Sequence, residues 1–389
     1  MERFALSRMK EWKENENRKP LIIRGARQVG KTWIMKTFGQ QYFEKTAYVN
    51  FDNNARMKQV FEGDLDIERL VLAISAETGV SIEAENTLII FDEIQEVPKA
   101  LTSLKYFHEN APQYAIVAAG SLLGVALHQG TSFPVGKVDF LDLYPLNFRE
   151  FLCAMGEKQF VSMLDSCDTQ MVTVFKTKYI ERLREYYFVG GMPEVVKDFS
   201  EKKDYNRVRV IQKNLINYYQ QDFSKHAEIK LVPRLNLVWN SIPMQLAKEN
   251  KKYIYGQVRE GSRAKDFELA IQWLLDCGLI HKVQRIQKPD LPLKAYIDFD
   301  AFKLFLVDIG LLIAMTDLDA KVIIEGNKIF TEFKGALTEQ YILQQLISDV
   351  GVIPYYYSTQ NSKGEIDFLV QGKTSVIPIE VKAEENLKA

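Results

Sequence analysis

The chain has 389 residues, a length typical of two or three domains, and 47% of them are hydrophobic. Charged residues make up 26%, so the composition is that of a folded protein and excludes disordered, collagen-like and membrane classes. Fifty Lys and Arg against fifty-one Asp and Glu give a net charge of −1, which excludes a protein that is basic throughout, although a local basic face is compatible with it.

Targeting and metal-binding signals are missing from the sequence. The N-terminal segment MERFALSRMKEWKENENRK is too charged for a signal peptide, and the longest apolar stretch, residues 115–127, is shorter than the roughly 20 residues that span a bilayer. Three cysteines and four histidines lie far apart, without the spacing of a zinc site. We therefore expect a cytoplasmic protein with no membrane partner.

The first 150 residues alternate short apolar runs with helical patterns. The runs at 21–25, 47–51, 88–92 and 115–120 are rich in β-branched residues, and residues 66–78 have apolar positions at helical spacing. Nearly continuous apolar runs are typical of strands that are buried on both faces. Strands that alternate with helices predict a parallel α/β sheet.

Residues 25–32 (GARQVGKT) fit the phosphate-binding pattern G-x-x-x-x-G-K-S/T between a predicted strand and a predicted helix. Backbone N–H groups of such a loop surround phosphate oxygens, while Lys31 reaches the β- and γ-phosphates and Thr32 binds Mg²⁺. The structural alternative is a glycine turn before a helix. The predicted ATP-binding residues are Gly25, Ala26, Arg27, Gln28, Val29, Gly30, Lys31, Thr32 and Trp33.

The run LIIFDE (88–93) ends in two carboxylates. Asp92 at the end of a buried strand predicts a second ligand for the Mg²⁺ held by Thr32, and Glu93 is the candidate to activate the attacking water. Strand 47–51 lies between the two motifs in the sequence, so their strands need not be neighbours in the sheet, as in ATPases with an additional strand. A solvated turn is the alternative for a lone Asp-Glu pair.

Ser121 follows the next strand, where a hydroxyl could sense the γ-phosphate or cap a helix. We count it with Lys31 and Glu93 among the catalytic candidates.

Residues 151–295 are mostly helical in pattern. Predicted helices at 234–250 and 264–280, followed by a strand-like run at 281–288, fit either a winged helix or three packed helices. Residues 201–265 hold fourteen basic and six acidic residues. A solvated helix surface is the more common meaning of such a charge run, and contact with duplex DNA is the functional alternative that the segment supports. The basic residues nearest the proposed turn are Lys251, Lys252, Arg259, Arg263 and Lys265.

The segment from 296 returns to strands, with a helix at 335–350. Glu380 and Lys382 are two apart on a predicted strand and share a face, Asp367 lies on the preceding strand, and Glu339 lies on the helix. A helix Glu, a strand Asp and a strand E-x-K are the parts of a PD-(D/E)-x-K nuclease site, so these three carboxylates with Lys382 predict a second Mg²⁺ site. The alternative is a nuclease-like fold without catalysis.

Taken together, GARQVGKT, FDEIQ, AAGS, YPLNFREF, YFVGGMPEVV and KLFLVDIGLL resemble a family of bacterial AAA-type ATPases with a C-terminal domain of unknown function. The resemblance covers nearly the whole chain. It implies an AAA-like P-loop core at 1–150, a helical lid or linker at 151–228, a winged-helix-like domain at 229–295 and a small α/β restriction-endonuclease-like domain at 296–389. Lys137 stands where family members often have Arg, so no arginine finger is assigned, and the chain's end at Ala389 suggests an incomplete last domain.

The leading interpretation is an ATPase that couples nucleotide state to domain movement. The alternatives are an ATP-switched DNA-binding protein and an ATP-dependent DNA nuclease. A protein partner of unknown identity and a homo-oligomer are further expectations, since AAA-type cores often form rings.

Overall fold

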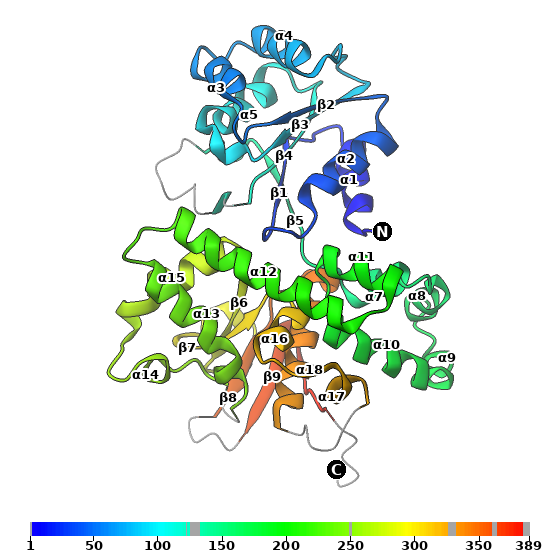
Figure 1. Cartoon of the computed structure of the whole chain (residues 1–389), viewed down its shortest axis with the longest axis vertical. Helices are drawn as coiled ribbons and strands as arrows, with labels where there is room; N and C mark the ends of the chain where they lie inside the picture. The colour runs from blue at the N-terminus through cyan, green and yellow to red at the C-terminus, as the bar shows by residue number, and fades with distance from the viewer. Residues whose placement is uncertain are drawn as a thin grey trace. The chain divides into compact units, whose positions relative to one another are not determined.

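The computed structural model divides the chain into two compact units, an N-terminal unit (Arg3–Tyr144) and a C-terminal unit that contains the chain from Pro145 onward. The structure describes residues 2–121, 123–124, 133–248, 251–325, 332–359 and 364–383 (Figure 1). Within these ranges, no helix is long and apolar enough to cross a membrane.

The N-terminal unit is a parallel α/β sheet, as predicted. The described strands pair in the order β2-β3-β4-β1-β5, and all of these pairs are parallel. The elements are α1 (Ala5–Glu14), β1 (Leu21–Arg24), α2 (Lys31–Tyr42), β2 (Lys45–Asn50), α3 (Ala55–Glu62), α4 (Ile67–Thr78), β3 (Thr87–Asp92), the 3-10 turn η1 (Ile94–Glu96), α5 (Pro98–Asn110), β4 (Ala115–Ala119) and β5 (Asp139–Asp142).

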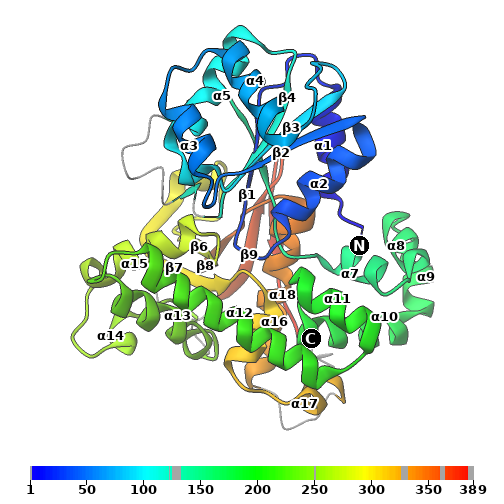
Figure 2. The ribbon, with the colours of Figure 1, turned by 45° about the horizontal axis from the view of Figure 1, so that its top comes forward.

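Helices cover both faces of this sheet, with α1 and α2 on one side and α3, α4 and α5 on the other (Figure 2). The strands β3 and β4 are buried along their whole length, which explains their continuous apolar sequences. On the α3–α5 side, the rings of Phe51, Phe61 and Phe91 meet edge to face with centroids 5.4–5.7 Å apart. This packing fixes the end of β3, where Asp92 and Glu93 follow.

The strand that separates β1 from β3 is β4, the third predicted strand in the sequence after β1. The strand at 47–51, which lies between the two motifs in the sequence, is β2. It is an outermost strand of the sheet and pairs with β3. The predicted separation of the two motif strands is therefore confirmed. Because the strands are parallel, the carboxyl ends of β1, β3 and β4 lie at one edge of the sheet.

The C-terminal unit begins with helices that pack on aromatic side chains. Phe223 of α12 contacts Trp239 of α13 and Trp273 of α15, with centroids 6.0 and 5.4 Å apart. These helices are α7 (Phe148–Ala154), α8 (Lys158–Asp165), α9 (Thr169–Val174), α10 (Lys176–Val189), α11 (Pro193–Lys202), α12 (Tyr205–His226), α13 (Val232–Leu246), α14 (Tyr255–Val258) and α15 (Ala264–Asp276).

A second sheet completes this unit, in the order β10-β9-β8-β6-β7. Among the described strands of this second sheet, only β6 and β8 pair in parallel, and the other pairs are antiparallel. The remaining elements are β6 (Ile280–Ile286), the 3-10 helix η2 (Leu293–Tyr296), β7 (Ile297–Leu306), α16 (Ile309–Met315), α17 (Ala320–Ile324), α18 (Glu332–Gln345), the π-helix η3 (Leu346–Val350), β8 (Tyr355–Ser358), β9 (Glu365–Gln371) and β10 (Val376–Ile379).

This sheet corrects the predicted domain boundary at 295–296. Strand β6 pairs on one side with β7 and on the other with β8, so segments 229–295 and 296–389 build one sheet rather than two separate domains. The apolar runs at residues 295–300 (AYIDFD) and 303–308 (KLFLVD) likewise contribute to the single strand β7. Pro378 lies in β10, an edge strand, where its missing N–H costs no ladder hydrogen bond.

Candidate functional site

The GARQVGKT loop joins β1 to α2 and adopts a backbone that only permissive residues allow. Gly25 and Gly30 have φ of +148° and +94°. A Cβ on Gly25 would lie 2.1 Å from the carbonyl oxygen of Leu143, so a side chain cannot be accommodated there. Helix α2 begins at Lys31, directly after the loop, and its N-terminal N–H groups and dipole favour an anion.

Lys31 is buried and its ammonium faces the loop. The Nζ atom donates to the carbonyl oxygens of Gly25 and Ala26, both at 2.8 Å. These are neutral acceptors, so phosphate oxygens are stronger partners for the same ammonium. The predicted position of Lys31 in the phosphate loop thus agrees with its contacts.

Thr32 and Asp92 meet at the sheet edge although 60 residues separate them. The Thr32 hydroxyl donates to Asp92 Oδ2 over 2.7 Å, and the Tyr48 hydroxyl donates to the same oxygen over 2.9 Å. Burial, and then the Asp92 charge, raise the pKa of Tyr48 well above its ordinary value, so this phenol stays a donor. A hydroxyl and a carboxylate at one point are the hard oxygen ligands that suit Mg²⁺, and the donor set fits that ion.

Glu93 lies beside this pair with its backbone in the left-handed region, at φ +51°. Its carboxylate accepts from Ser121 Oγ at 2.9 Å and from Gln95 Nε2 at 2.7 Å, and the Ser121 N–H lies 3.4 Å away. Burial works against the charge, but these donors and the charge of Lys31 outweigh it and lower the pKa of Glu93. Glu93 is therefore an ionised carboxylate in a fixed position.

The sequence reasoning missed Tyr48 and Gln95. Tyr48 is on β2, whose register places Asn50 beside Asp92, so only the strand pairing brings its hydroxyl to the carboxylate. Gln95 could have been found from its place two residues after Glu93. Its amide packs on Gly120, where a Cβ would lie 2.2 Å from Gln95 Oε1.

The other predicted residues of the nucleotide site are consecutive in the loop and the first turn of α2. Ala26 and Val29 are buried, and the Val29 carbonyl accepts from Arg3 Nη1 at 3.0 Å. Trp33 is exposed. Lys137, which stands in place of a family arginine, forms an ion pair with Glu109 at 2.9 Å.

The predicted second Mg²⁺ site does not assemble. Glu339 of α18 is buried and pairs with Lys251, and its other oxygen lies 3.5 Å from Lys303 Nζ. Asp367 accepts the Val381 N–H at 2.7 Å. Within the described ranges, no group of three or more His, Cys, Asp or Glu residues could hold a metal ion.

The two remaining members of that cluster, Glu380 and Lys382, are exposed and pair with each other. The β9–β10 register ends at Ile379 and Phe368, one residue before Glu380 and Asp367, so a shared face for these two carboxylates stays a prediction. Glu339 differs from the predicted metal ligand, because the ammonium groups of Lys251 and Lys303 supply the positive charge at its carboxylate. Burial raises the pKa of Glu339 in spite of those two lysines.

Comparison with protein families gives three matches. Residues 17–152 match an AAA domain, residues 180–322 a domain of unknown function (DUF8612) and residues 334–389 another domain of unknown function (DUF4143). The chain therefore carries an AAA-type P-loop domain. The comparison with curated proteins gives no significant match.

Several solved structures are distantly similar. A Walker-type ATPase of Pyrococcus abyssi is 15% identical, with 81% of this chain and 95% of that chain covered and a TM-score of 0.49. Drosophila ORC bound to DNA is 12% identical, with 80% of this chain and 93% of that chain covered and a TM-score of 0.30. The RuvB Holliday junction branch migration motor of Thermotoga maritima is 11% identical, with 71% of this chain and 87% of that chain covered and a TM-score of 0.30. Identities this low identify none of them as a functional equivalent.

Proposed function

We propose that the N-terminal unit binds ATP with Mg²⁺ and hydrolyses it, and that the nucleotide state controls the movement of the C-terminal unit. One observation carries the proposal: the Thr32–Asp92 pair and the Glu93–Ser121 pair lie together at one sheet edge, next to the phosphate loop. These are the parts that phosphoryl transfer to water requires.

Each residue has a role that follows from its contacts. Lys31 exchanges the carbonyls of Gly25 and Ala26 for phosphate oxygens, while the loop N–H groups hold the phosphate chain. Thr32 and Asp92 supply the oxygen ligands for Mg²⁺, which neutralises phosphate charge when bound. Glu93 accepts a proton from the attacking water, and Ser121, which donates to Glu93, is placed to respond to the γ-phosphate.

Binding of a fluorescent ATP analogue and release of inorganic phosphate test this proposal. Lys31→Ala should weaken binding at least about tenfold and abolish turnover, because a charge-assisted contact to the phosphates is lost. Lys58→Ala, which removes an exposed lysine of α3, is the matched control and should leave both unchanged. Equal binding and turnover by the two variants would overturn the assignment of the loop.

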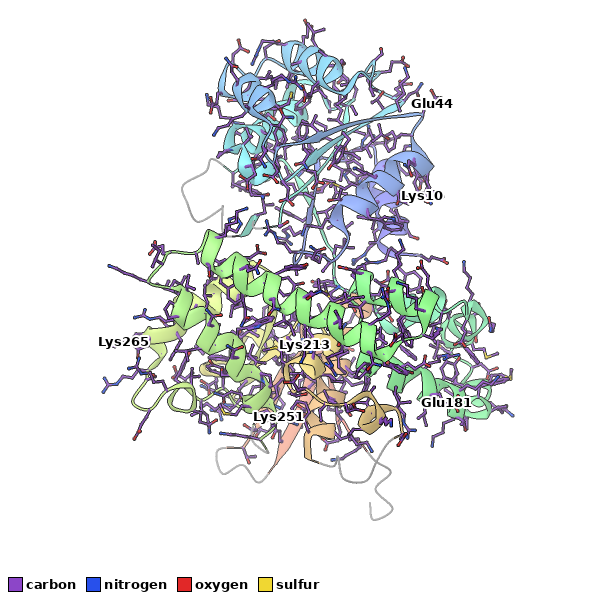
Figure 3. All side chains as sticks on the ribbon, in the orientation of Figure 1. Lys10, Glu44, Glu181, Lys213, Lys251 and Lys265 are labelled. Atoms are coloured by element: carbon purple, nitrogen blue, oxygen red, sulfur yellow. The ribbon has the colours of Figure 1, made fainter. Side chains whose placement is uncertain are left out.

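A second candidate function is contact with duplex DNA by the C-terminal unit. The order α13–α14–α15, followed by the antiparallel pair β6–β7, supports a winged-helix reading. Arg263 and Lys265 are exposed at the start of α15, Arg259 is exposed directly after α14, and Lys265 lies at the periphery of this unit (Figure 3).

The structure removes Lys251 from the predicted DNA-contact residues. Its ammonium is largely buried and pairs with Glu339, so its charge is committed inside the unit. Lys252 is half-buried, and its charge acts on Asp298. The test of DNA contact therefore belongs at the start of α15.

Replacing Arg263 and Lys265 by Glu should weaken duplex binding to the same degree for all sequences and reduce the slope of log affinity against log salt by about two. The control is the double change of Lys178 and Lys197 to Glu, since both lysines are exposed on other helices of this unit. Titration of labelled duplex at several salt concentrations measures both slopes. If the two double variants behave alike, the basic segment is a solvated surface.

A further inference from the structure

Lys303, the first residue of the motif KLFLVDIGLL, is buried in the C-terminal unit. It lies on β7, and its side chain is only 1% exposed. A lysine ammonium is strongly hydrated in water, so lysine is almost never fully buried unless opposite charges surround it. The acidic groups around Lys303 therefore indicate what this part of the fold is built to hold.

Carboxylates from two elements lie around the ammonium of Lys303. Its Nζ atom donates to Glu365 Oε1 of β9 at 2.6 Å and lies 3.5 Å from Glu339 Oε2 of α18. The charge of Asp367, which is also on β9, acts on the same ammonium. The Tyr356 ring of β8 provides an aromatic face, with Nζ 4.7 Å from the ring centroid. These are the surroundings of a bound cation.

The carboxylates keep Lys303 charged. Burial alone would lower the pKa of this ammonium, but the charges of Glu339, Glu365 and Asp367 outweigh burial and raise it. Among the described residues, Glu339 Oε2 has no hydrogen-bond partner, so the ammonium 3.5 Å away is what balances its charge. Lys303 is therefore a fixed positive charge at the centre of an acidic cluster.

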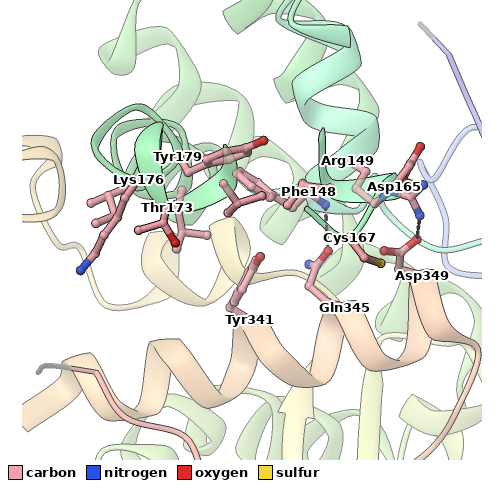
Figure 4. Close-up of a pocket in the computed structure, with 14 residues that line it drawn as sticks. Phe148, Arg149, Asp165, Cys167, Thr173, Lys176, Tyr179, Tyr341, Gln345 and Asp349 are labelled. Carbon is pink, nitrogen blue, oxygen red and sulfur yellow. Dashed lines mark hydrogen bonds and ion pairs between the residues drawn. The ribbon is translucent and has the colours of Figure 1, made fainter. Parts of the chain in front are cut away.

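Helix α18 holds Glu339 in place through contacts on its other side. Tyr341 and Gln345 point toward the helices α7 and α10 (Figure 4). The Tyr341 ring packs edge to face on Phe148 with centroids 6.2 Å apart, and Gln345 Oε1 accepts the Phe148 N–H at 2.8 Å. On the side of Glu339, Lys251 pairs with the second carboxylate oxygen. The helix thus presents Glu339 to two lysines from a fixed position.

This arrangement does not fit the metal ion that a nuclease-like fold implies. The carboxylates of Glu339, Glu365 and Asp367 are oxygen donors of the kind that Mg²⁺ prefers. A divalent cation among them would, however, lie beside the buried ammonium of Lys303, and the two positive charges would repel each other. The ammonium and the metal ion therefore compete for one position.

We propose that the Lys303 ammonium takes the place of a divalent cation in this cluster, and that the C-terminal unit uses this internal cation to hold α18 to β9. A nuclease reaction that depends on a metal ion at these carboxylates then has no site, so any contact of this unit with DNA is binding alone. The inference is independent of the proposed ATPase activity, because all of these residues belong to the C-terminal unit.

Removing the ammonium tests the proposal. Lys303→Ala leaves the carboxylates gathered without a cation and makes room for one, so Mn²⁺ should now bind there. The readout is the thermal unfolding midpoint of the full chain in about 1 mM Mn²⁺ and in EDTA, where binding to the folded chain alone raises the midpoint. We expect the rise for Lys303→Ala to exceed that of the parent by about 3 °C or more. The nucleotide site is the same in both proteins, so its own response to Mn²⁺ cancels.

Two control variants locate the added response. Combining Lys303→Ala with Glu339→Gln should abolish it, because a ligand of the new site is lost. Lys282→Ala removes a lysine of the same sheet, on β6, whose Nζ lies 4.3 Å from the centroid of the Phe302 ring. This variant should respond to Mn²⁺ as the parent does.

Three results would overturn the proposal. The first is a response of Lys303→Ala no larger than that of the parent, and the second is an added response that persists in the double variant. The third is a larger rise with Mn²⁺ for the parent than for Glu339→Gln, which would show that the native carboxylates bind the metal ion. That last comparison leaves Lys303 in place, so it decides the question even where Lys303→Ala does not fold. Mn²⁺-dependent cutting of plasmid DNA by the parent that Glu339→Gln abolishes would have the same meaning.

Discussion

The carboxylate of Glu93 receives hydrogen bonds from Gln95 and Ser121, and the Gln95 amide is in turn confined by Gly120. A carboxylate held by donors is well oriented but weakly basic. Gln95 thus positions Glu93 and is one of the groups that lower its pKa against the effect of burial. This is a role that no motif assigns to it.

Gln95→Leu should raise the pKa of Glu93, because a donor to the ionised form is lost. The acidic limb of the pH profile of ATP turnover should then move to higher pH, with a lower maximum rate. Gly120→Ala, which pushes the Gln95 amide away, should shift the profile in the same direction. Gln113→Leu, an exposed glutamine of the same unit, serves as control. A profile that is unchanged in both test variants would show that Gln95 does not act on Glu93.

Asp308 joins two motif segments inside the C-terminal unit. It caps α16 by accepting the Leu311 N–H at 3.1 Å, and it accepts the Gly191 N–H at 2.6 Å. A Cβ on Gly190 would lie 2.2 Å from Asp308 Oδ1 and a Cβ on Gly191 would lie 2.1 Å from the Leu146 carbonyl oxygen, which explains the paired glycines of YFVGGMPEVV. Burial raises the pKa of Asp308 to about 6 despite these donors.

This raised pKa predicts a pH-dependent stability. The unfolded carboxyl titrates near 3.8 and the folded one near 6, so the contribution of Asp308 is fully present below about pH 4 and is lost as the pH rises to about 6. The loss amounts to roughly 3 kcal/mol. Urea unfolding of the parent and of Asp308→Asn between about pH 3.5 and about pH 7 measures it, since Asn lacks the titration. Parallel curves for the two proteins would contradict the raised pKa.

At the scale of elements, α18 is attached to its neighbours by glutamines. Gln340 accepts the Leu306 N–H at 3.0 Å and donates to the Leu306 carbonyl at 2.7 Å, as a strand partner would. Gln344 accepts the Ile309 N–H and donates to Tyr186 Oη, both at 3.0 Å. These contacts satisfy buried backbone groups at the end of β7.

Gln340→Leu should destabilise the C-terminal unit by about 2–4 kcal/mol, because it leaves a buried N–H and a buried carbonyl without partners. Gln221→Leu, an exposed glutamine of α12, should change the free energy of unfolding by less than about 0.5 kcal/mol. Thermal or urea unfolding of both variants measures the difference. A loss for Gln340→Leu as small as that for the control would mean that water replaces the lost contacts.

The elements differed in how far the sequence could predict them. Strands β1, β3 and β4 were predictable because burial on both faces leaves a continuous apolar run. Strand β8, a four-residue run of YYYS, gives no such pattern and was missed. Its parallel pairing with β6 joins distant segments, and no local signal indicates such a pairing.

The same reasoning applies to the sites. The Thr32–Asp92 contact was predictable because two motifs on parallel strands must end at one edge. The pairing of Lys251 with Glu339 was not, since 88 residues separate them and each fits another role when considered alone. Lys251 was predicted to contact DNA and Glu339 to bind a metal ion, and in the structure these two residues pair with each other instead.

At the scale of the whole molecule, the chain joins an AAA-type P-loop unit to a unit in which helices and a mixed sheet share one body. The second unit contains both segments that match domains of unknown function, and strands from each pair in one sheet. Coupling between nucleotide state and the second unit, a protein partner and a homo-oligomer stay predictions.

The most direct measurement is ATP turnover by Glu93→Gln beside the parent, with ATP binding measured on the same preparations. Glutamine keeps the size of the side chain but cannot accept the proton of the attacking water. We expect the parent to hydrolyse ATP, and the variant to bind ATP within about threefold of the parent's affinity while turning over about 100-fold or more slowly. A variant that turns over like the parent would contradict the account of this site.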